Sequence, residues 1–184
     1  MVEKTMKKPS IIYLVGIVLF VCGVGLFVFD KIQTNSMDKY TQMVVEQIQD
    51  VLPTRTQAIV GQYTNVSMPV FEVEDVDYCG LLEIERMNVL LPIADVWDSK
   101  KVLSRYDGSV YDGTMVVGGV GLEVVTQLDL NDRIHVVDML GGEFTYSISR
   151  IDRVSDMNSF ESSSSLVLFC YISSEGKYVV VSCK

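Results

Sequence analysis

Apolar and polar positions along most of this chain form the short runs that are typical of β-strands. From residue 70 onward these runs are rich in β-branched residues and are separated by turn residues, as in "LLEIERMNVLLPI", "TMVVGGV", "RIHVVDML", "EFTYSISRI", "SLVLF" and "KYVVVSC". Gly141-Gly142, between the third and fourth runs, supplies the positive φ angles of a tight hairpin. The pattern predicts one all-β domain over residues 70–184, with no long helix between its strands.

The N-terminal part of the chain has a different pattern. Residues 11–29, "IIYLVGIVLFVCGVGLFVF", carry no charge and are long enough to cross a hydrocarbon core of about 30 Å as a helix. No small-residue cleavage site follows, so we expect the span to stay attached. The three lysines within residues 1–10 favour a cytoplasmic N-terminus. The chain is therefore predicted to be anchored in a plasma membrane, with its β domain outside the cell.

Between the span and the β domain, the apolar positions recur every three or four residues, which is the amphipathic helix period. These positions are Met37, Tyr40, Val44, Ile48 and Val51. The pattern predicts a juxtamembrane helix over 30–52 that ends at Pro53. Residues 53–69 are mostly polar and are predicted to be a linker.

Charge and composition exclude several classes of function. The formal net charge is −9, from 24 acidic and 15 basic residues, which is opposite to what a nucleic-acid partner requires. The four cysteines form no CxxC pair and His135 is the only histidine, which argues against a zinc site. "EVEDVD" lacks the ligand spacing of a calcium loop, and "GGVG" lacks the third glycine of a dinucleotide fingerprint. We expect no cofactor, and we leave open a disulfide between Cys79 and Cys183.

Residues 68–184 contain six short sequence phrases in the same order as the conserved phrases of a known protein family. Gly80, Leu82 and Ile84 precede Leu91-Pro92-Ile93, with Glu85 where a proline would stand. The later phrases are "SRYDGSVYDGTMVVGGV", "LDLNDRIHVVD", "LVLFC" and "GKYVVVSCK". Together they resemble the sortases, the membrane-anchored cysteine transpeptidases of Gram-positive cell surfaces. The resemblance implies a closed sortase-like β-barrel of about seven or eight strands.

The resemblance also implies three catalytic residues: a histidine, a cysteine and an arginine. Aligning "MVVGGVG" with the family's Gly-His segment puts Val120 on the histidine. In one register Cys170 takes the cysteine position and Lys177 the arginine position. A slip of one residue puts Tyr171 and Tyr178 there instead. We favour Cys170 with Lys177.

These differences replace residues that the family uses for catalysis. Valine at position 120 cannot transfer a proton to a leaving group or stabilise a thiolate. Lysine lacks the planar fork with which arginine donates two parallel hydrogen bonds. Cys170 in apolar surroundings is also what an inert core thiol looks like.

The leading hypothesis is therefore a catalytically degenerate sortase-like protein that binds a sorting-signal-like peptide, a pilin or an active sortase. The alternative is an active cysteine transpeptidase in which Cys170 attacks, Lys177 stabilises the oxyanion, and His135 or water transfers protons. A third hypothesis is an unrelated anchored β domain used for structure or partner contact.

Overall fold

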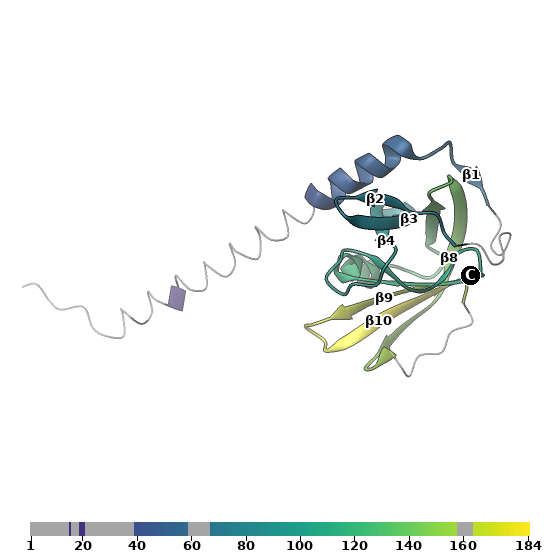
Figure 1. Ribbon diagram of the computed structural model, residues 1–184. Helices are drawn as coiled ribbons and strands as arrows, with labels where there is room; N and C mark the ends of the chain where they lie inside the picture. The colour runs from purple at the N-terminus through teal and green to yellow at the C-terminus, as the bar shows by residue number, and fades with distance from the viewer. Residues whose placement is uncertain (1–14, 16–18, 21–38, 59–66, 158–163) are drawn as a thin grey trace, which may run out of the picture. The chain divides into compact units, whose positions relative to one another are not determined.

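The computed structural model describes residues 15, 19–20, 39–58, 67–157 and 164–184 (Figure 1). The chain divides into two compact units, Met1–Tyr40 and Thr41–Lys184. The predicted membrane span over 11–29 lies almost wholly outside the described residues. Among the residues that are described, no helix is long and apolar enough to cross a membrane.

Residues 39–51 form a helix, which is the described part of the helix predicted over 30–52. Within the second unit, Val44 and Ile48 lie one turn apart on this helix and are fully buried. Glu46 and Gln49 are exposed. Val44 and Ile48 are therefore buried as the pattern predicts, whereas Val51, which the pattern also places on the apolar face, is 51% exposed. Residues 30–38 lie outside the described residues.

The second unit is built mainly of β-strands. The strands are β1 (Thr56–Gln57), β2 (Phe71–Val73), β3 (Val76–Ile84), β4 (Val89–Ala94), β5 (Ser104–Ser109), β6 (Thr114–Gly118), β7 (Arg133–Asp138), β8 (Gly142–Val154), β9 (Leu166–Ile172) and β10 (Lys177–Cys183). In the described residues, two 3-10 helices interrupt the strands, η1 (Glu85–Met87) and η2 (Val120–Gln127).

In the described part of the chain, eight strands close into a mixed barrel in the order β3-β4-β5-β6-β9-β10-β8-β7, and β7 pairs again with β3. The β4–β5 and β6–β9 pairs are parallel and the other pairs in the ring are antiparallel. The predicted all-β barrel of about seven or eight strands is thus confirmed. The short strands β1 and β2 lie outside the ring and pair with β8 and β3.

The long strand β8 closes the barrel because it changes partner along its length. Residues 143–147 pair with β7, and residues 148–154 pair with β10. Its inward side chains Phe144, Tyr146 and Ile148 are at most 1% exposed. They pack in one core cluster with inward residues of β3, β7, β9 and β10. Each large apolar side chain buried in this way contributes roughly 1.5–3 kcal/mol relative to exposure.

A buried carboxylate fixes the hairpin between β7 and β8. Asp138 is 1% exposed, and its Oδ2 accepts a hydrogen bond of 2.6 Å from the Tyr111 hydroxyl. Its Oδ1 accepts bonds from the backbone N–H groups of Leu140 (2.9 Å) and Gly142 (2.7 Å). Gly141 has φ 78°, which confirms the expected positive φ at this glycine, whereas the φ of Gly142 is not positive. The carboxylate thus replaces water for three donors at a tight turn.

Three local features differ from the sequence prediction. The run "LLEIERMNVLLPI" is two strands joined by η1, because Asn88 adopts a left-handed conformation with φ 51° and reverses the chain. The eight-residue η2 directly follows β6, where we expected no helix. In the predicted linker, β1 pairs with β8 and Met68 is buried in the core.

We predict that Asp138→Ala lowers the free energy of unfolding by about 3 kcal/mol, because it leaves buried donors without their acceptor. Urea unfolding of the full chain measures the loss. Asp112→Ala is the control, since Asp112 is an exposed acidic residue, and its effect should stay within about 0.5 kcal/mol. Equal stability of the two variants would show that the carboxylate does not hold the turn.

Candidate functional site

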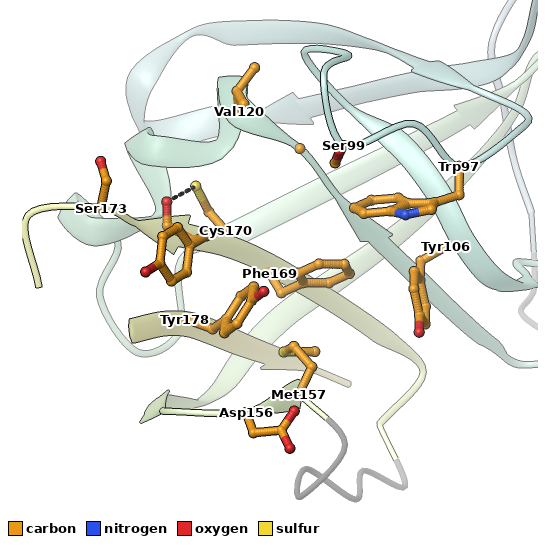
Figure 2. A pocket seen from close by; sticks show the side chains of 12 residues that line it. Trp97, Ser99, Tyr106, Val120, Asp156, Met157, Phe169, Cys170, Ser173 and Tyr178 are labelled. Atoms are coloured by element: carbon orange, nitrogen blue, oxygen red, sulfur yellow. Dashed lines mark hydrogen bonds between the residues drawn. The ribbon is translucent and has the colours of Figure 1, made fainter. Parts of the chain in front are cut away.

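A cavity of about 620 Å³ opens on the outer side of the barrel, where β6 and β9 run side by side (Figure 2). Its described lining comes from the segment after β4, from β5, from the start of η2, from the residues that follow β8, from the end of β9 and the turn after it, and from the start of β10. The lining residues are Trp97, Ser99, Tyr106, Gly119, Val120, Asp156, Met157, Phe169, Cys170, Tyr171, Ser173 and Tyr178.

Two glycines allow the close packing beneath this cavity. Gly118 pairs with Phe169, and a Cβ on Gly118 would lie 2.4 Å from the ring atom Cζ of Phe169. A Cβ on Gly119 would lie 2.4 Å from the carbonyl oxygen of Val102. Glycine at both positions therefore lets the ring and the backbone approach β6 closely, and this places Val120 at the cavity.

Polar contacts hold the segment that carries Trp97. Arg105 Nη2 lies 2.6 Å from Asp95 Oδ1, which joins the start of the segment to β5. The buried Ser104 hydroxyl donates to the Asp98 carbonyl at 3.1 Å and accepts from the Asp98 N–H at 3.2 Å. These bonds fix the backbone beside Trp97, so the indole has a defined position against Phe169, with ring centroids 5.4 Å apart.

The structure brings Cys170 and Val120 to the same cavity, but their exposure differs. Val120 is 43% exposed, whereas Cys170 is 2% exposed and belongs to the core cluster with Leu166 and Leu168. The thiol lies 3.7 Å from the carbonyl oxygen of Tyr171, and Figure 2 draws this contact. Side chains alternate along β9, so the exposed Tyr171 has the opposite orientation.

The pairing of β9 with β10 bears on the two catalytic registers considered above. Cys170 lies opposite Val179, and Lys177 lies opposite Ile172. Lys177 is exposed and is not among the described lining residues. Tyr171 lies directly opposite Tyr178, with ring centroids 5.0 Å apart, and both rings line the cavity. The two tyrosines are therefore the cross-strand pair at this site.

His135 lies on β7 and does not line the cavity. Its Nδ1 is 3.1 Å from the Thr145 hydroxyl and 3.2 Å from Glu143 Oε1, and its Nε2 is 3.7 Å from Glu85 Oε2. Since it is the only histidine in the chain, no imidazole lines the cavity.

The other described cysteines are core residues. Cys79 and Cys183 are fully buried free thiols, so the pairing left open above does not form. Burial raises the pKa of each thiol to about 12. Cys22 lies outside the described residues. The raised pKa therefore favours the protonated, unreactive form of Cys79 and Cys183 at neutral pH.

Sequence reasoning missed the aromatic character of the site. Trp97, Tyr106 and Phe169 pack on one another, with centroid distances between 5.2 and 5.5 Å. Trp97 follows the "LPIADV" phrase without periodic neighbours. The alternation within "LVLFCYI" was the available signal for Phe169 and Tyr171, since it places them on the face opposite Leu168 and Cys170.

No protein-family model matches the sequence, and no curated protein matches it. Solved structures do match. The sortase D5 transpeptidase of Clostridium perfringens superposes with a TM-score of 0.50 at 15% identity, over 59% of this chain and 78% of that chain. Sortase C-1 of Actinomyces oris gives 0.48 at 19% identity, over 59% and 74% of the two chains. The first similarity shows that the barrel has the sortase fold, at low sequence identity.

We predict that Gly118→Ala displaces the Phe169 ring and lowers the free energy of unfolding by about 1–3 kcal/mol, because the new methyl group overlaps the ring. Trp97 is the only tryptophan, so its fluorescence reports the displacement and urea unfolding reports the cost. On a Phe169→Leu background the same change should cost less, since the overlapping ring atoms are gone. Equal costs on both backgrounds would contradict the overlap.

Proposed function

We propose that this chain is a sortase-like cell-surface protein that binds an extended segment of another envelope protein in the cavity without transferring an acyl group. The fold that it shares with a transpeptidase supports a polypeptide as the ligand. The candidates are a sorting-signal-like peptide, a pilin and an active sortase. The proposal includes the location expected above, a plasma membrane of a Gram-positive bacterium with the barrel outside.

The observation that carries the proposal is that Val120 lines the same cavity as Cys170 and that the described lining contains no imidazole. Acyl transfer by a cysteine needs a partner that withdraws the thiol proton and returns a proton to the leaving group. Val120 occupies the position that the resemblance assigns to this partner, and His135 lies elsewhere. None of the described lining residues is basic, so none of them can stabilise an oxyanion as a cation.

One observation favours a second function, an active cysteine transpeptidase. Cys170 lines the same cavity as Gly119 and Val120, as the nucleophile of such an enzyme would. In that mechanism Cys170 attacks the substrate carbonyl, Lys177 stabilises the oxyanion, and water or His135 transfers the protons. The mechanism requires Cys170 to become accessible and to ionise at neutral pH.

Alkylation of the full chain separates the two functions. We predict that iodoacetamide modifies Cys170 at neutral pH at least about tenfold more slowly than it modifies the same cysteine in urea, because the folded thiol is buried. Peptide mapping by mass spectrometry assigns the label to each cysteine. Cys79 and Cys183 provide internal standards for buried thiols with raised pKa. Rapid labelling of Cys170, together with peptide cleavage that disappears in Cys170→Ala, would establish the enzyme instead.

Binding is tested with a synthetic sorting-signal peptide added to the full chain. We predict saturable binding without cleavage products, and weaker binding by at least about fivefold in Tyr178→Ala, which removes a ring from the cavity. Leu130→Ala is the matched control, because Leu130 is an exposed apolar residue that does not line the cavity. Equal binding by the two variants would place the peptide elsewhere.

A further inference from the structure

Five aromatic side chains form a continuous wall along the cavity: Trp97, Tyr106, Phe169, Tyr171 and Tyr178. The centroid distances are 5.2 Å between Trp97 and Tyr106, 5.4 Å between Trp97 and Phe169, 6.3 Å between Phe169 and Tyr178, and 5.0 Å between Tyr178 and Tyr171. In Figure 2 the rings of Trp97, Phe169 and Tyr178 lie in sequence along the cavity. The aromatic wall therefore presents apolar surface and electron-rich ring faces to one occupant.

The described residues that line the cavity carry only negative charge. Asp156 is the only charged residue among the described lining residues, and it is exposed. Met157 beside it adds apolar surface. The whole chain carries a formal net charge of −9, so the field over the domain also favours a cation. An acidic occupant would meet the Asp156 carboxylate and the ring faces, both of which repel an anion.

We propose that the cavity accepts a lysine or arginine side chain of the bound polypeptide, an inference that rests on the proposed function. The aliphatic stem packs on the aromatic wall, and the charged end lies over a ring face and toward Asp156. Lysine and arginine combine an apolar stem with a cationic end, and cations are attracted to aromatic faces. A neutral aliphatic side chain matches the stem contacts but not the charge.

The test uses capped tripeptides, acetyl-Ala-X-Ala-amide, in which X is lysine, arginine, norleucine or glutamate. Each is titrated into the full chain while the fluorescence of Trp97, the only tryptophan, is followed. We expect the lysine and arginine peptides to bind about tenfold more tightly than the norleucine peptide, whose side chain has similar length but no charge. The advantage should shrink at high salt, and the glutamate peptide should bind most weakly.

Two variants separate the contribution of the Asp156 carboxylate to lysine binding from that of the Tyr178 ring. Asp156→Asn should reduce the advantage of lysine over norleucine while leaving norleucine binding unchanged. Tyr178→Leu should weaken the lysine peptide more than the norleucine peptide, because leucine keeps apolar surface but has no ring face. Asp112→Asn, at an exposed acidic residue that does not line the cavity, is the control for overall charge. Urea unfolding checks that each variant is folded.

Each result decides the inference separately from the proposed function. Equal or tighter binding of the norleucine peptide overturns the cationic preference and leaves a peptide-binding cavity. An Asp156→Asn effect no larger than that of Asp112→Asn also overturns it. A lack of response to every tripeptide overturns it as well, and the sorting-signal peptide then tests the proposed function by itself. A preference for lysine and arginine that depends on Asp156 and Tyr178 confirms it.

Discussion

The parallel pairing of β6 with β9 determines where the residues of the site lie. It places Gly118 against the Phe169 ring and aligns the end of β6, where η2 begins, with the end of β9. A glycine at this contact leaves room for an aromatic ring on the outer face of a sheet. Tyr106 on β5 and Trp97 in the segment before β5 then pack on that ring. Glycine at position 118 thus allows the aromatic packing that lines part of the cavity.

Much of the fold is predictable because a strand has a side-chain period of two. The runs from residue 70 onward are strands, and the glycine turn at 141 forms as expected. The order of strands in the ring cannot be read from local sequence, because the β3–β7 and β6–β9 pairs each join segments that are far apart in the chain. The division of "LLEIERMNVLLPI" depends on the left-handed conformation of Asn88, which the apolar run conceals.

The sequence predicts which segments of the chain form the site better than it predicts which side chains line the cavity. The sequence indicates Val120, Cys170 and Lys177 as candidate site residues. Val120 and Cys170 line the cavity, whereas Lys177 is not among its described lining residues. The orientation of each β9 residue follows from its register, which puts Cys170 toward the core and Tyr171 toward the outside. Trp97 lies outside the strands, so the side-chain period of a strand does not predict that it lines the cavity. The resemblance to sortases predicts a thiol at the site, whereas five of the twelve described lining residues are aromatic.

Closure of the barrel through β7 has a consequence for how the protein folds. The ring is complete only when β7 has joined both β3, which is far back in the sequence, and the adjacent β8. The β6–β9 pair likewise joins distant segments. Ordering a long intervening loop costs entropy before the contacts form, and chains dominated by such distant pairings fold in milliseconds to seconds rather than microseconds. The aromatic cavity lies at the β6–β9 pair, so it can form only once these two distant segments have met.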